Sequence, residues 1–151
     1  TEGRMIVGCD IDQPIGRDLR LRTRQQIRED GKRALTRVRV LERFRVHSLV
    51  EAELATGRTH QIRVHLSSIG FPLIGDRRYG ARGKIPPAAQ ETLVSLLRGF
   101  SRQALHAYRL GFEHPVTAKK LNFEVPLPAD MQGLIEALQH DRDTHPQSAD
   151  G

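Results

Sequence analysis

Cysteine is almost absent from this sequence: Cys9 is the single one among 151 residues. One thiol forms neither an internal disulfide nor a structural zinc site of several cysteines. A reducing, cytoplasmic setting is therefore expected. No basic residue adjoins Cys9 in the sequence, so we expect an inert, half-buried side chain rather than a nucleophile.

Long apolar runs are missing as well. The unbroken apolar runs are only a few residues long, far below the ~20 that a membrane-spanning helix needs, which excludes a spanning segment. The first residues are not followed by the apolar stretch of a secretory signal. Because the chain does not begin with Met, we expect a processed or excised piece of a longer protein. Its length suits one domain of about 100–200 residues.

Lysine is scarce among the basic residues, since 20 of the 24 are arginine and the net charge is +6. Guanidinium groups suit phosphate and stack on bases, although a GC-rich genome gives the same composition. Positions 17 to 45 hold 11 basic and four acidic residues, a net charge of +7 that exceeds the total. This stretch is typical of a nucleic-acid-binding surface or of a solvated charged hairpin.

Alternating apolar residues predict two strands that meet near positions 42–45. Val38 and Val40 belong to the first strand, and Val46, Val50 and Leu54 to the second. A period of two over this length favours a half-buried antiparallel pair. Residues 1–36 should form short strands and loops with little core of their own. Two later strands are expected over residues 105–113 and 121–125.

Three helices are expected. Thr59 should cap a helix over residues 60–69, with Ile62, Leu66 and Ile69 on one apolar stripe and Gly70 ending it. A second helix should run over 86–98, with inward-facing side chains from Leu93, Leu96 and Leu97. A third should run over 129–140. The sequence thus predicts one α+β domain over residues 1–140, with a largely antiparallel sheet, and a polar tail over residues 141–151.

The densest polar cluster is GRTHQIRVH at positions 57–65. A helix N-terminus attracts anions, and Arg63 shares a face with Thr59 and His60. Arginine is unfavourable at this positive helix end, so a specific partner is expected, although a charged surface turn is the simpler interpretation. His60 and His65 are five apart and diverge by about 140°, which disfavours a metal site. Asp76 follows Gly75 and is expected to stabilise a turn rather than act as an acid.

The same cluster carries a resemblance to a known family. LATGRTHQIRVHL at 54–66, GFPLIGD at 70–76 and YG at 79–80 are similar to the RluA-type pseudouridine synthases. PIGR at 14–17 and GKRALT at 31–36 resemble that family's basic hairpin. RQALHA at 102–107, HP at 114–115 and PLP at 126–128 resemble its C-terminal signature. The resemblance spans nearly the whole chain except the tail, and is greatest to bacterial members that act on large-subunit ribosomal RNA.

The resemblance implies isomerisation of uridine to pseudouridine in ribosomal RNA, without a metal or organic cofactor. In this family an aspartate attacks, and the base is detached, rotated and rejoined through carbon. That aspartate lies in an HRLDxxTSG stretch, followed by a YxA segment, and neither occurs in these 151 residues. The chain is therefore expected to be the C-terminal part of a catalytic domain and to be inactive alone. A non-catalytic RNA-binding module on the same scaffold is the alternative.

The resemblance also assigns roles to residues. Arg63 is the arginine that pairs with the absent nucleophilic aspartate, and a guanidinium favours an ionised carboxylate. Ile62 lies near the target base. The residues expected to line the RNA cleft or grip its backbone are Arg58, Thr59, His60, Gln61, Arg17, Lys32 and Arg33.

A domain cut midway has physical consequences. We expect an open strand edge and an uncovered apolar face. We also expect the open edge to be covered, either by a second copy of the chain or by a rearranged N-terminus. We also expect Arg63 to lack the carboxylate of the nucleophile. Its side chain should then be more hydrated than in the complete enzyme, because an unpaired buried charge costs several kcal/mol.

Overall fold

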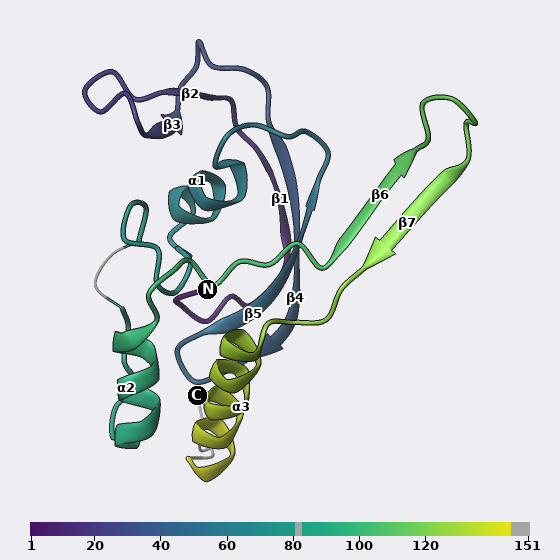
Figure 1. Cartoon of the computed structure of the whole chain (residues 1–151). Helices are drawn as coiled ribbons and strands as arrows, with labels where there is room; N and C mark the ends of the chain where they lie inside the picture. The colour runs from purple at the N-terminus through teal and green to yellow at the C-terminus, as the bar shows by residue number, and fades with distance from the viewer. Residues whose placement is uncertain (81–82, 146–151) are drawn as a thin grey trace.

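The structure is a computed structural model that describes residues 1–80 and 83–145 (Figure 1). Five strands precede two helices, and a two-stranded hairpin and a third helix follow. All strand pairs in these residues are antiparallel. The α+β class and the three helices are therefore confirmed. No helix in the described part of the chain is long and apolar enough to cross a membrane.

The main sheet has three strands. β4 (Leu35–Arg43) is central, with β1 (Cys9–Asp12) on one side and β5 (Ser48–Leu54) on the other. The β4–β5 pair is the one that the alternation predicts, with Val38 opposite Ala52. Cys9 begins the edge strand β1 and is exposed, so the expectation of a half-buried thiol is wrong.

Two hairpins flank this sheet. β2 (Ile15–Arg17) and β3 (Gln25–Ile27) form a short one that lies over helix α1 (Figure 1). β6 (Arg109–Glu113) and β7 (Lys120–Glu124) form a second one that projects away from the body. The expected strand over 105–113 is thus shorter, because the paired register of the hairpin begins at Arg109, opposite Glu124.

The projecting hairpin has one apolar face. Leu110 pairs with Phe123 and Phe112 with Leu121, so these four side chains share a side of the ribbon. Leu110 is 60% exposed and Phe123 is 54% exposed. The rings of Phe112 and Phe123 stack with centroids 5.9 Å apart. The hairpin therefore carries an exposed apolar face, and a link between this face and the missing half of the domain stays a prediction.

The helix boundaries differ from the predicted ones. α1 is Gln61–Ser68, and its N-cap is His60 with a φ of 56° and no side-chain cap, so the predicted Thr59 cap is wrong. α2 is Glu91–Gly99, which begins well after Pro86 and Pro87. Leu93 and Leu97 are buried in α2, but Leu96 is 40% exposed and does not face inward.

The last helix extends further than predicted. α3 is Ala129–Thr144, so the helix runs four residues beyond its predicted end at residue 140. Asp141 is buried and accepts a hydrogen bond of 3.0 Å from Nη1 of Arg45. This contact with the turn between β4 and β5 holds the end of α3 against the body. The rest of the expected tail, residues 146–151, lies outside the described residues.

Buried apolar side chains form three clusters. One lies between α2, α3 and the turn after β4, and contains Phe44, Ile74, Leu93, Leu97, Phe100, Met131, Leu134 and Leu138. A second joins the main sheet to α1 through Met5, Ile11, Val38, Leu66 and Leu73. The third contains Ile15, Ala34, Val64 and Tyr79, and it attaches the β2–β3 hairpin to α1. The early residues therefore pack into clusters shared with later elements.

Candidate functional site

The start of α1 is fixed by Gln61, whose side chain is only 3% exposed. Its Nε2 donates to the carbonyl oxygen of Leu35 at 2.9 Å and to the hydroxyl of Thr36 at 3.0 Å. Its Oε1 accepts from the hydroxyl of Thr56 at 2.8 Å and from the N–H of Arg58 at 2.9 Å. Its amide is therefore buried and bonded within the chain, and a contact of Gln61 with RNA stays a prediction.

His60 begins the helix in a left-handed conformation, which a non-glycine residue rarely adopts. Its Nδ1 lies 2.8 Å from the hydroxyl of Tyr79. Burial lowers the pKa of His60, and the positive charges of Arg63 and Arg78 lower it further. The contact with Tyr79 thus holds a neutral imidazole beside the first turn of α1.

Arg63 faces the loop that follows α1. Its Nε and Nη2 donate to the two carboxylate oxygens of Asp76 at 2.7 and 2.8 Å. The Arg63 side chain is 14% exposed and that of Asp76 is fully buried. In this chain Asp76 therefore balances the charge of Arg63, and the expectation that Arg63 is more hydrated here than in the complete enzyme stays a prediction.

Asp76 has the turn-stabilising role that the sequence suggests, as well as this ion pair. Its Oδ1 accepts from the backbone N–H groups of Arg78 and Tyr79, at 3.0 and 3.1 Å. Burial raises the pKa of the Asp76 carboxyl, but the hydrogen bonds from Arg63, Tyr79 and Arg78 outweigh it and the net pKa is lowered. Asp76 is therefore an ionised anchor at the first turn of α1.

Tyr79 connects the loop after α1 to the β2–β3 hairpin. Its hydroxyl accepts from the N–H of Gln25 at 2.9 Å. Two guanidinium carbons lie over its ring, that of Arg24 at 5.2 Å and that of Arg63 at 4.8 Å from the centroid. Sequence reasoning assigned Tyr79 no role of its own, and its place in the block of resemblance was the only available signal.

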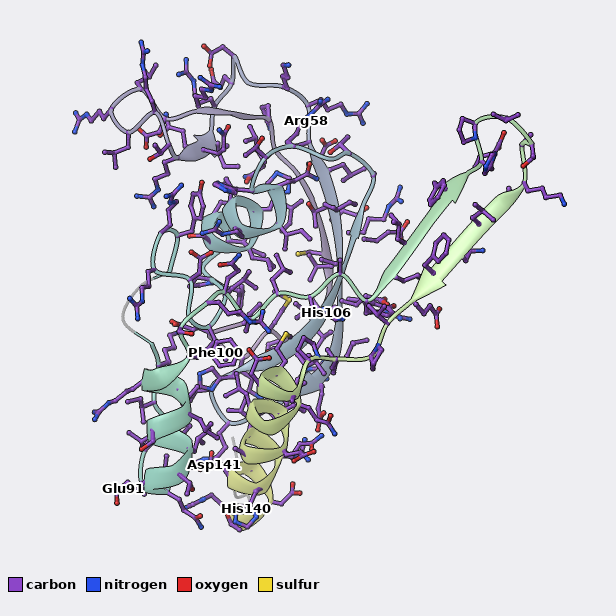
Figure 2. All side chains as sticks on the ribbon, viewed as in Figure 1. Arg58, Glu91, Phe100, His106, His140 and Asp141 are labelled. Carbon is purple, nitrogen blue, oxygen red and sulfur yellow. The ribbon has the colours of Figure 1, made fainter. Side chains whose placement is uncertain are left out.

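Exposed basic residues gather at the end of the molecule that carries the β2–β3 hairpin. Arg58 lies at this end (Figure 2), and its Nε donates to the carbonyl oxygen of Arg33 at 3.0 Å. Arg17, Lys32 and Arg33 are exposed. Thr59 is exposed as well, and Ile62 packs partly buried against the cluster of the main sheet. The structure therefore brings the predicted RNA-contacting residues other than Gln61 to the same end of α1.

The later part of the basic stretch does not join this surface. Arg37 and Arg39 lie on β4 and pair with Glu53 and Glu51, at 3.5 and 2.6 Å. Arg45 turns inward to Asp141. The charge over positions 17–45 is therefore not one patch, because its second half is neutralised across the sheet.

His65, in the polar segment at positions 57–65, has hydrogen-bond partners within the chain. Nδ1 of His65 lies 2.9 Å from the hydroxyl of Thr36, and Nε2 lies 2.9 Å from the carbonyl oxygen of Gln13. Burial lowers the pKa of His65. Among residues 1–80 and 83–145, no group of three or more His, Cys, Asp or Glu side chains is placed to hold a metal ion.

Comparison with known proteins shows what this chain is similar to. The RNA pseudouridylate synthase model matches residues 10–68. Ribosomal large subunit pseudouridine synthase D of Vibrio parahaemolyticus is 49% identical over 143 residues, which is 95% of this chain and 44% of the relative. The protein of that name in Pseudomonas aeruginosa is 50% identical over 93% of this chain. The chain is thus similar to RNA pseudouridylate synthases over most of its length. The expected likeness to synthase D is confirmed.

Solved structures of the pseudouridylate synthase family share the fold. Human RNA Pseudouridylate Synthase Domain Containing 4 superposes with a TM-score of 0.67 at 26% identity, over 91% of this chain and 59% of that one. Human RNA Pseudouridylate Synthase Domain Containing 1 gives a TM-score of 0.64 over 91% of this chain and 62% of that one. The chain spans less than half the length of the curated relatives and about three fifths of these structures.

Proposed function

We propose that residues 1–145 are the C-terminal part of a catalytic domain that isomerises uridine to pseudouridine in large-subunit ribosomal RNA. The nucleophilic aspartate comes from a part of the enzyme outside this chain. The names of the relatives, ribosomal large subunit pseudouridine synthase D, support the reaction and the substrate. A cytoplasmic location is part of the proposal, and the free thiol of Cys9 fits it.

The observation that carries the proposal is the geometry of Arg63. It lies in the first turn of α1, nearly buried, with one edge of its guanidinium on Asp76. A second carboxylate held against the remaining edge is kept ionised by the charge and by the donated hydrogen bonds. A family nucleophile needs this state in order to attack. Ile62, one residue before, is placed to contact the flipped base, whose unstacking costs a few kcal/mol.

We assign RNA binding to the exposed basic residues near the start of α1. Arg17, Lys32, Arg33 and Arg58 are exposed near the start of α1, where Thr59 and His60 also lie. Phosphate contacts of this kind position RNA without reading its sequence, and they make binding depend on salt.

The alternative is a non-catalytic RNA-binding module, and one observation favours it. The 151 residues contain no HRLDxxTSG stretch, so the chain by itself has the surface but not the nucleophile. We expect the isolated chain to bind ribosomal RNA and to leave uridine unchanged under either proposal. The two differ in what the complete gene product does.

The deciding experiment measures pseudouridine formation by the complete gene product on large-subunit ribosomal RNA, by mass spectrometry of nuclease digests. Arg63→Ala should abolish turnover and leave RNA affinity within about twofold, because Arg63 supports the nucleophile rather than the RNA backbone. Arg142→Ala is the matched control, because Arg142 lies on α3 and pairs with Glu42 of β4. RNA binding without pseudouridine in the wild-type product would establish the alternative.

The RNA surface has its own test. Alanine at Lys32 or Arg58 should weaken binding of unrelated RNA sequences alike, and lower the salt slope by about 1 for each lost phosphate contact. Arg39→Ala is the control, because Arg39 is exposed but paired with Glu51 on the main sheet. Equal losses in Arg39→Ala and Lys32→Ala would contradict a surface at the start of α1.

The exposed apolar face of the β6–β7 hairpin suggests where the missing half of the enzyme binds. We propose that the missing half of the enzyme covers Leu110, Phe112 and Phe123, and that the isolated chain self-associates through this face or the open edges of the main sheet. The isolated chain should show concentration-dependent sedimentation that Phe112→Ser reduces. A chain that stays monomeric at all concentrations contradicts the self-association.

A further inference from the structure

Arg63 and Asp76 form a two-point contact through one edge of the guanidinium. Nε donates to Oδ2 at 2.7 Å and Nη2 donates to Oδ1 at 2.8 Å. Such a fork fixes the plane of the guanidinium as well as its position. The pair joins the first turn of α1 to a loop 13 residues later.

Asp76 is itself held rigidly. Two backbone N–H groups bind its Oδ1, and its carbonyl oxygen accepts from the N–H of Gly80 at 2.8 Å. Gly75 adopts a φ of 74°, and a Cβ there would lie 2.1 Å from the carbonyl oxygen of Arg102. The backbone that carries the Asp76 carboxylate therefore has little freedom.

Tyr79 restricts the guanidinium from a second direction. Its buried ring lies with its centroid 4.8 Å from Cζ of Arg63, so the guanidinium lies over the ring. Nη1 of Arg63 has no hydrogen-bond partner among residues 1–80 and 83–145. With the Nε–Nη2 edge occupied by Asp76, the Nη1 edge is the donor surface left for another anion.

We propose that Asp76 is a positioning residue for Arg63 in the isomerisation. It occupies the Nε edge and turns the Nη1 edge toward the carboxylate that attacks uridine. Arg63 then serves two carboxylates, a permanent one in this chain and the nucleophile from the rest of the enzyme. The inference rests on the proposed function. It also accounts for the low exposure of Arg63 in a chain without the nucleophile, since Asp76 balances its charge.

Asp76→Asn tests the inference with little change of shape. An asparagine whose carbonyl oxygen replaces Oδ1 keeps the bonds from Arg78, Tyr79 and Nη2 of Arg63. Its NH2 group then replaces Oδ2 and faces the Nε–H of Arg63. Because both groups are donors, this hydrogen bond is lost. Asp130→Asn is the matched control, because Arg102 binds Asp130 through the same fork, at 2.8 and 2.8 Å, on exposed surface.

The measurement is turnover of the complete gene product on large-subunit ribosomal RNA. Asp76→Asn should lower kcat about 100-fold, the effect of a misplaced active-site group, and leave RNA affinity within about twofold. Asp130→Asn should change neither quantity. In an Arg63→Lys background, which lacks the fork, Asp76→Asn should lower kcat less than about threefold further, because Asp76 acts through Arg63.

The outcomes separate the inference from the function on which it rests. Equal kcat in Asp76→Asn and Asp130→Asn overturns the inference alone. A 100-fold loss in both Arg63 backgrounds, or a loss of RNA affinity that matches the loss of kcat, also overturns it, because Asp76 then acts as a general structural residue. A wild-type product that makes no pseudouridine refutes the proposed function and the inference together.

Discussion

The hydroxyl of Tyr79 and Nδ1 of His60 lie 2.8 Å apart, and this contact joins the loop after α1 to the residue that starts the helix. The same hydroxyl accepts from the N–H of Gln25. Since that bond uses a lone pair, the phenolic proton is free to be donated to Nδ1 of a neutral His60. The site is thus assembled by side chains that connect three separate segments of the chain.

Replacing Tyr79 by phenylalanine should loosen this assembly. The variant removes the acceptor of the Gln25 N–H and the partner of His60, so unfolding free energy should fall by about 1–2 kcal/mol. Tyr108→Phe is the matched control, because the Tyr108 hydroxyl bonds Glu51 on exposed surface, and the change should stay within about 0.5 kcal/mol. Denaturant unfolding measures the change in unfolding free energy, and amide hydrogen exchange measures the protection of the Gln25 N–H. Unchanged exchange at Gln25 in Tyr79→Phe contradicts the role of the hydroxyl.

Gln61→Ala should destabilise the fold rather than weaken RNA binding directly. The change removes the four hydrogen bonds that the buried Gln61 amide makes, which costs about 3 kcal/mol in unfolding free energy. Gln132→Ala is the control, since Gln132 is exposed and bonds only Glu136 on α3. Normal stability with reduced RNA affinity in Gln61→Ala would support the prediction of an RNA contact.

The sequence predicts well what depends on neighbours and poorly what depends on distant contacts. Val38 and Val40 alternate with arginines, and β4 forms where that period indicates. Asp76 has its expected turn role, because that role involves residues two and three positions on. Its bond to Arg63 requires a folded loop, and no local pattern contains it.

The ends of two helices show the same limit. His60 starts α1 in a left-handed conformation supported by Tyr79, 19 residues away, whereas Thr59 looks like the better cap from sequence alone. Asp141 belongs to a polar run that reads as a tail, but Arg45 binds it from 96 residues away. A buried charge pair is invisible to hydropathy because both partners look like surface residues.

Acid should weaken the fold partly through His47. This side chain is 1% exposed, neither ring nitrogen has a partner among the described residues, and burial lowers the pKa of His47 to about 4. A lowered histidine pKa stabilises the fold fully above about 6.5, and that stability is lost as pH falls from 6.5 toward 4. Unfolding free energy should therefore drop between pH 7 and pH 5, by on the order of 1–2 kcal/mol from this residue.

His47→Leu isolates this contribution. The leucine has similar volume and no nitrogen to protonate, so the variant should lose less stability than the wild type between pH 7 and pH 5. His140→Gln is the control, because His140 is exposed on α3 and should leave the pH dependence as it is. Denaturant titrations at the two pH values measure both. Parallel pH profiles of wild type and His47→Leu would show that His47 is not responsible.

The buried end of α3 gives the last prediction. Asp141 is 3% exposed and binds Arg45, which is 12% exposed and also donates to the carbonyl oxygen of Pro87 at 2.6 Å. Asp141→Ala leaves the Arg45 guanidinium without its countercharge, so unfolding free energy should fall by about 3 kcal/mol. Asp143→Ala, two residues on, removes an exposed partner of Arg142 and should cost less than about 0.5 kcal/mol. Equal, small losses in both variants would mean that the domain ends near residue 140, because the last turn of α3 then contributes nothing to the fold.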